Sequence, residues 1–361
     1  MFRNRLYYGI KPLFPAPMRM SVRRWFALRK RETVLDRWPI LPGSEKRPKD
    51  WAGWPNGKQF ALLLTHDVEG PEGLSRCRQL MQLEKKLGFR SSFNFIPEGE
   101  YQVASELLDE LKAHGFEIGV HDLHHDGKLY SSRREFAQKA LRINNYLQKW
   151  GAVGFRSGFM LHNLEWLHDL NVSYDSSTFD TDPFEPQPDG VGTIFPFWVP
   201  RNNSQSFQNP TSALGSSHVT RHSPLGTPPG YVELPYTLPQ DSTIFLLLRE
   251  RHPDIWVHKL DWIARHGGMA LLAIHPDYVS FGSTDRSSLT YDALLYEEFL
   301  TLVKERYQGR YWHALPKEVA QFYSESRLTQ SYAQSTPNVS ESKTVPLSLC
   351  AFKQGQSLNP T

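Results

Sequence analysis

The chain has 361 residues, with 41 Lys or Arg against 38 Asp or Glu, and only two cysteines. This length suffices for one large domain with attachments or for two modest domains, each with a substantial buried core. Cys77 and Cys350 are too few for a disulfide framework or a thiolate metal cluster within one chain, so we expect a reducing, cytoplasmic location.

Membrane insertion and export are not predicted. The longest apolar runs, residues 60–64 and 269–274, are much shorter than the roughly 20 residues that span a bilayer. The first 18 residues contain basic side chains, but Lys11, Pro12 and Pro15 interrupt the apolar stretch that a signal peptide requires.

The first 58 residues differ from the rest of the chain. Residues 1–37 contain ten Lys or Arg against two Asp or Glu, whereas the remainder is acidic overall. The mixture of arginines with Trp25 and Phe26 suits peripheral contact with an anionic membrane or docking to a partner, although a solvated tail and a nucleic-acid contact are alternatives. Residues 38–58 are dense in Pro, Gly and Trp and predict an ordered loop packed on the body.

The body, residues 59–325, alternates short apolar strands with helical patterns. This order implies parallel strands in an α/β fold, either an open doubly wound sheet or a barrel. The expected strands cover residues 60–66, 91–96, 116–121, 152–157, 172–177, 269–275 and 311–315. The expected helices cover residues 73–87, 103–115, 132–150, 254–266, 289–307 and 316–325.

Two segments fall outside this alternation. Residues 201–230 are rich in Ser, Asn, Pro and Gly and predict an insertion, either a lid or a tolerated surface loop. Residues 326–361 have many Ser, Thr and Gln and few aromatics, which predicts a disordered tail.

Two acidic residues follow the first expected strand. Strand side chains alternate, so Asp67 and Glu69 point to one side while His66 and Val68 point to the other. Parallel α/β folds place their sites at the carboxyl ends of strands, and both carboxylates belong to one such end. Taken alone, the pair is equally consistent with two solvated loop acids.

Two histidines follow the third expected strand. His121 and His125 are four residues apart, and one helical turn would bring both imidazoles to the same face, a spacing that suits a divalent ion. An isolated pair is more often two surface histidines, but the carboxylates at a neighbouring strand end favour a metal site. His124 is interpreted as a bystander or as a neighbour of the ligands.

Three further polar residues end later strands. Arg156 is placed to pair with a carboxylate, Asp175 follows the fifth strand, and His275 follows six apolar residues. A lone histidine in such a position usually belongs to the core. Beside a metal site and two acids, His275 is better interpreted as an acid/base group.

These five clusters, in this order, resemble the five motifs of the polysaccharide deacetylase superfamily, the NodB-homology domain of carbohydrate esterase family four. The matching segments are Thr65-His66-Asp67-Val68-Glu69, His121 to His125, Arg156-Ser157-Gly158, Asp175-Ser176-Ser177 and Leu272-Ala273-Ile274-His275. The resemblance covers about residues 59–325 and is closest to a bacterial branch that opens with Leu-Thr-His-Asp-Val-Asp or Glu. The stretches SYDSSTFDTDPFEPQP and VELPYTLPQD also resemble that branch.

The resemblance implies a distorted (β/α)₇-type barrel and a metal-dependent hydrolase that removes N- or O-acetyl groups from sugars. It implies that Asp67 is the general base and that Arg156 holds it. It also implies that His275 is the general acid and that Asp175 orients it. His121 and His125 would bind the metal, and Glu69 would be the third ligand, because Val68 replaces the usual second aspartate.

Three functions therefore remain open. The first is deacetylation of an acylated amino sugar, as a sugar nucleotide, a lipid-linked sugar or a growing glycan, in the biosynthesis of a cell-surface polysaccharide. The second is hydrolysis of another N-acyl group, such as formyl, and the third is a non-catalytic glycan-binding or scaffold role. Zn²⁺ is the expected metal, with Co²⁺, Fe²⁺ and Ni²⁺ as alternatives. A nucleic-acid partner is not expected, because the body is acidic and lacks a recognisable base-reading module.

Overall fold

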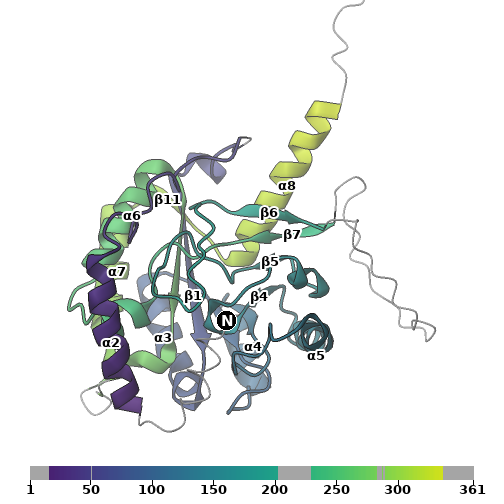
Figure 1. Ribbon diagram of the computed structural model, residues 1–361. Helices are drawn as coiled ribbons and strands as arrows, with labels where there is room; N and C mark the ends of the chain where they lie inside the picture. The colour runs from purple at the N-terminus through teal and green to yellow at the C-terminus, as the bar shows by residue number, and fades with distance from the viewer. Residues whose placement is uncertain (1–15, 50, 202–228, 283–286, 288, 336–361) are drawn as a thin grey trace, which may run out of the picture.

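Parallel strands form a curled sheet at the centre of the molecule (Figure 1). The computed structural model describes residues 16–49, 51–201, 229–282, 287 and 289–335. The parallel series comprises β1 (Phe60–Val68), β2 (Ser92–Phe95), β3 (Glu117–His121), β4 (Gly154–Arg156), β5 (Tyr174–Asp175), β7 (Gly230–Glu233) and β8 (Met269–Ile274).

The series closes on itself. β1 pairs in parallel with β2 and with β8, and beyond β7 the chain reaches Leu238, which forms a parallel bridge to Leu272 of β8. The sequence left an open sheet and a barrel as alternatives, and this closure decides between them. The distorted barrel of the (β/α)₇ type is thereby confirmed.

The remaining strands lie at the margins. β6 (Phe197–Pro200) pairs antiparallel with β7, and β11 (Tyr311–His313) pairs with the start of β1. β9 (Val279–Ser280) and β10 (Tyr291–Asp292) form a separate two-stranded ladder.

Helices follow the strands, and most match the predicted ranges. They are α3 (Pro71–Leu87), α4 (Ser105–Ala113), α5 (Arg133–Trp150), α6 (Asp254–His266), α7 (Ala293–Arg306) and α8 (Pro316–Ser335). In α5, buried apolar residues recur every three or four positions, from Phe136 to Trp150, as required for one face on the sheet. Ser132 caps its N-terminus by accepting from Glu135 N at 3.2 Å, and Gly151 ends it with φ of 62°.

The alternation in β1 divides the core into two parts. All nine residues of β1 are buried. Leu62, Leu64 and Val68 belong to the cluster between sheet and helices, whereas Ala61 and Leu63 belong to the cluster inside the barrel. Because side chains alternate, Asp67 continues the inward row and emerges at the mouth of the barrel.

The terminal segments differ from prediction in two ways. α8 continues to Ser335, ten residues beyond the boundary predicted for the tail, while residues 336–361 lie outside the described residues. The basic arm contains α2 (Ala16–Glu32), which the sequence did not predict because its basic residues fall all round the helical wheel. Most of the predicted insertion, residues 202–228, also lies outside the described residues.

The predicted loop at 38–58 packs on the body, with residue 50 outside the described residues. Trp38 and Trp54 are buried, and Trp54 Nε1 donates to Gly267 O at 2.9 Å. Lys259 of α6 donates to Pro39 O and to Asp180, so a buried ion pair holds the start of this loop. Among the described residues, no helix is sufficiently long and apolar to span a membrane.

Candidate active site

One pocket opens at the carboxyl ends of the strands. Asp67, Glu69, His121 and His275, from three different strand ends, all line it. These four residues were singled out from the sequence, and the fold brings them together across more than 200 residues of chain.

Asp67 occupies a fully hydrogen-bonded position at the bottom of the pocket. Both of its carboxylate oxygens lie 3.2 Å from Arg156 Nη1, and Asn94 Nδ2 donates to Oδ1 at 2.9 Å. Burial alone would raise its pKa, but the charges of Arg156, His121 and His275 outweigh burial and lower the pKa to about 2. Asp67 is therefore held as a carboxylate.

Arg156 has no freedom to leave this position. Its Nη1 also donates to Thr65 Oγ1 at 2.8 Å, and its other nitrogens donate to Ser176 O and Ser176 Oγ at 2.8 and 2.7 Å. The side chain is buried, so the guanidinium is a fixed positive charge beside Asp67. The predicted pairing of Arg156 with Asp67 is present.

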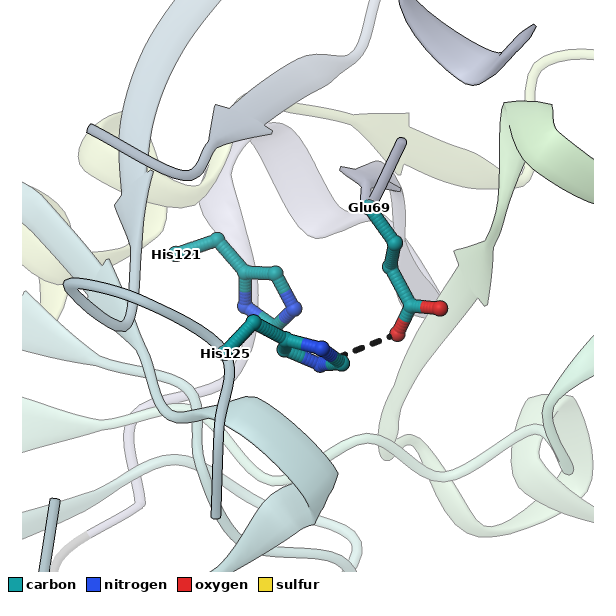
Figure 2. Close-up of side chains that lie close together, drawn as sticks. All are labelled: Glu69, His121 and His125. Carbon is teal, nitrogen blue, oxygen red and sulfur yellow. Dashed lines mark ion pairs between the residues drawn. The ribbon is translucent and has the colours of Figure 1, made fainter. Parts of the chain in front are cut away.

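Glu69, His121 and His125 converge beside Asp67 (Figure 2). One potential ligand atom from each residue lies within 4.8 Å of the others. Glu69 Oε1 lies 3.1 Å from His125 Nε2, and the carboxylate points toward both imidazoles. Burial would raise the pKa of Glu69, but the three nearby histidines hold it well below its usual value. One carboxylate and two imidazoles are a suitable donor set for a catalytic divalent ion.

Hydrogen bonding prepares His121 to act as a ligand. Its Nδ1 lies 3.1 Å from Arg156 O, a carbonyl that can only accept, so Nδ1 carries the proton. Nε2 is then left with a free lone pair, and this buried atom has no hydrogen-bond partner. Burial also lowers the pKa of His121, which favours the neutral ring that a metal requires. The residues present therefore fit a divalent metal.

The two histidines meet through a loop and not through the predicted helical turn. Asp122 and His125 have positive φ values of 55° and 53°, and these fold the chain back after β3. The His125 ring stacks on Phe159, with centroids 4.3 Å apart. A Cβ on Gly158 would lie 2.7 Å from His125 Cδ2 and 2.6 Å from Asp122 Oδ2. The glycine of the Arg156-Ser157-Gly158 motif thus leaves room for the histidine loop.

The segment after β8 holds Glu69 in place. Tyr278 donates its hydroxyl proton to Glu69 Oε2 at 2.9 Å, which leaves Oε1 facing the histidines. Asp277 accepts from Glu69 N at 2.8 Å and from Gly73 N, at the start of α3, at 3.1 Å. The sequence did not predict that Tyr278 and Asp277 hold Glu69, because neither residue belongs to a motif that indicates such a contact.

His275 is oriented by Asp241, which corrects the prediction made for Asp175. His275 Nδ1 lies 2.6 Å from Asp241 Oδ1, and His275 N donates to Asp241 Oδ2 at 2.9 Å. Tyr291 and the backbone N–H of Ser242 complete the hydrogen bonding of Asp241. Burial would lower the pKa of His275, but Asp241, Glu69 and Asp67 raise it to about 10, so the ring is held protonated.

Asp175 lies elsewhere on the sheet. It accepts from Ser177 N and Ser177 Oγ at 3.0 and 2.7 Å and faces a second buried acid, Glu233. Burial raises the pKa of Asp175, and burial together with Asp175 raises that of Glu233. Ser177 Oγ also donates to Ser157 Oγ at 3.1 Å. Through Ser177, Asp175 therefore supports the Arg156-Ser157-Gly158 segment, against which the histidine loop packs.

Sequence reasoning missed Asp241 because several acids occupied plausible strand ends. The available signal was local: Asp241 ends the stretch VELPYTLPQD and precedes Ser-Thr and an apolar run, the pattern of a helix N-cap. It does cap the short helix η6 (Ser242–Leu247). His124 lies away from the three converging ligands, with Nδ1 3.0 Å from Glu98 O.

Comparisons with known proteins agree with this architecture. No protein-family model and no characterised protein sequence matches the chain. A crystal structure of a candidate polysaccharide deacetylase from Mycobacterium smegmatis superposes with a TM-score of 0.51 over 83% of this chain and 99% of that chain, at 17% identity. The chain has the polysaccharide deacetylase fold.

Two further solved structures are similar at lower scores. Peptidoglycan deacetylase PdaC from Bacillus subtilis is 13% identical, with a TM-score of 0.42 over 78% of this chain and 100% of that chain. A pseudoenzyme of carbohydrate esterase family four is 16% identical, with a TM-score of 0.40 over 74% of this chain and 68% of that chain. The fold assignment rests on the M. smegmatis structure.

Proposed function

We propose that the protein is a metal-dependent hydrolase that removes an N-acetyl or O-acetyl group from a sugar in the biosynthesis of a cell-surface polysaccharide. The observation that carries this proposal is the convergence in one pocket of a fixed carboxylate, a three-residue donor set and a protonated histidine. The predicted location is the cytoplasm, with peripheral contact at the inner membrane face as the option that the basic arm suggests.

The metal site would be formed by Glu69, His121 and His125. A bound divalent ion, with Zn²⁺ as the first candidate and Co²⁺, Fe²⁺ or Ni²⁺ as alternatives, would acidify water and polarise the acyl oxygen.

Two side chains of the protein would transfer the protons. Asp67, held ionised by Arg156, accepts a proton from the water whose oxygen adds to the acyl carbon. His275, held protonated by Asp241, donates a proton to the amine as the carbon–nitrogen bond breaks, or to the alkoxide of an ester. The products are the free carboxylic acid and the amino sugar or alcohol.

Metal content and product analysis test the proposal. We expect about one ion per chain by elemental analysis after Zn²⁺ loading and desalting, reduced in Glu69→Ala and lost in the double variant His121→Ala/His125→Ala. The loaded protein should release acetate from a panel of N-acetylated amino sugars. Release of formate from the matching N-formylated sugars, without release of acetate from the N-acetylated ones, would identify the other acyl group. A folded protein that retains no metal would favour the non-catalytic scaffold.

A further inference from the structure

Helix α2 is anchored to the body by one face. Met20, Arg24, Ala27 and Arg31 recur every three or four residues and therefore share this face. Ala27 is buried, Arg24 Nε donates to Leu246 O at 2.7 Å, and Arg31 pairs with Glu250 at 2.5 Å. These contacts fix the rotation of the helix about its own axis.

The opposite face of α2 exposes large apolar side chains. Met18, Val22, Trp25 and Phe26 are 50, 49, 50 and 61% exposed, and their spacing places them about half a turn from the anchored residues. Trp25 and Phe26 contact each other edge to face at 4.8 Å, and the Arg29 guanidinium lies 4.2 Å above the Trp25 ring. We call Met18, Val22, Trp25, Phe26 and Arg29 the outer face of α2.

Positive charge lies on and beside the outer face. α2 contains six Lys or Arg and a single acidic residue, Glu32. By helical geometry, Arg23 and Lys30 lie along one edge of the helix, between the outer face and the anchored face. Arg24, Lys30 and Arg31 bind the body, whereas Arg23 and Arg29 are exposed beside or on the outer face. Basic residues therefore occur all round the helix, and no clean apolar stripe is visible in the sequence.

We propose that the outer face of α2 binds the interfacial region of an anionic phospholipid bilayer. Exposed tryptophan and phenylalanine on a helix rich in arginine are suited to the headgroup boundary, where aromatic rings are half buried and phosphates neutralise the cations. Figure 1 shows α2 along the outer edge of the molecule, where its ridge can lie on a flat surface.

The docked helix also borders the candidate active site. Met20 and Arg23 line the same pocket as Asp67 and His275. Because Met20 belongs to the anchored face, docking would place the pocket one helix diameter, ~10 Å, from the lipid surface. This proximity would favour an acylated sugar carried on a membrane lipid. This consequence rests on the proposed function, whereas the docking itself does not.

Vesicle sedimentation of the full-length protein tests the docking without any activity measurement. We expect binding to vesicles of phosphatidylcholine with about 30% phosphatidylglycerol, little binding to phosphatidylcholine alone, and weaker binding as salt is raised from about 0.1 M to about 0.5 M. Trp25→Ser/Phe26→Ser should lower the partition coefficient by about tenfold or more, because two aromatic rings no longer leave water. Arg29→Gln should lower it by about fivefold, because one cation no longer meets the phosphates.

A matched control is available on the same molecule. Leu141 in α5 and Leu294 in α7 are 68 and 63% exposed, so Leu141→Ser/Leu294→Ser also removes two exposed apolar side chains. This variant should bind vesicles as the wild type does, and both double variants should keep the wild-type unfolding temperature.

Three results would overturn the proposal. They are the absence of wild-type binding to anionic vesicles, vesicle binding that survives Trp25→Ser/Phe26→Ser, and a self-associated wild type that this variant converts to monomers without any vesicle binding. If vesicles bind as expected but no acyl sugar is hydrolysed, the proposed function fails while the docking stands.

Discussion

Two groups of buried acids in the barrel domain have partners of opposite kinds. Asp67 and Asp241 each face a cation, Arg156 and His275 respectively. Asp175 faces another acid, Glu233, and both of their pKa values are raised. The comparison shows that each aspartate acquires its role from the side chain that the fold places beside it, and not from its place in the chain.

The largest expected effect comes from Asp67. Asp67→Asn preserves the volume of the side chain but removes the proton acceptor, so we expect kcat of the metal-loaded enzyme to fall by about 10³-fold. Metal content by elemental analysis should stay near one per chain, because Asp67 is not among the three converging ligands. Wild-type activity in this variant would place the base elsewhere.

Asp241→Asn tests the second acid that faces a cation, the partner of His275. The amide cannot stabilise the charge on His275, so kcat should fall by about 10²-fold and the unfolding temperature should change little. The informative comparison is with Asp175→Asn under the same conditions. If Asp175→Asn loses more activity than Asp241→Asn, the orienting role returns to Asp175.

Tyr278→Phe is expected to have a smaller effect, on metal affinity. It removes the hydrogen bond to Glu69 Oε2 and leaves the ring in place, so the carboxylate can rotate away from the histidines. We expect metal affinity, measured by competition with a chelator, to weaken by about tenfold. Tyr296→Phe removes the hydroxyl of another buried tyrosine, bonded to Glu84, and should leave metal affinity unchanged.

Asp175→Asn should change activity least, by less than about threefold, and should instead alter how stability depends on pH. Because the folded-state pKa values of Asp175 and Glu233 are raised, the folded protein retains protons that the unfolded chain releases, and this contribution to stability is lost as pH rises above about 4. Replacing one of the two acids should make the free energy of unfolding depend less on pH. Chemical denaturation between about pH 4 and pH 8 measures the free energy of unfolding at each pH. If this free energy falls with pH equally in wild type and variant, Asp175 and Glu233 do not interact as described.

Periodicity made most of the barrel predictable. Apolar alternation in β1 correctly placed Asp67 and Glu69 on one side, with His66 turned away to pair with Glu84 among the helices. The fold also places His121 and His125 together, but through positive φ at Asp122 and His125 and not through a helix. A spacing of four residues indicates proximity without identifying the backbone path.

Long-range contacts were beyond prediction. Asp241 could not be chosen over Asp175, because the choice depends on which segment lies beside β8, and that is the segment of Leu238, which bridges Leu272. α2 was missed for a different reason: its apolar residues are divided between an anchored face and an exposed face, so neither produces a strong periodic signal. In both cases the deciding partner is distant in sequence.

The site depends on the length of the four-residue turn from His275 to Tyr278. Within one short turn, His275 is the proposed acid, Asp277 holds the start of α3 and the backbone of Glu69, and Tyr278 holds the Glu69 carboxylate. Inserting or deleting one residue here would disconnect proton donation, metal binding and helix packing together.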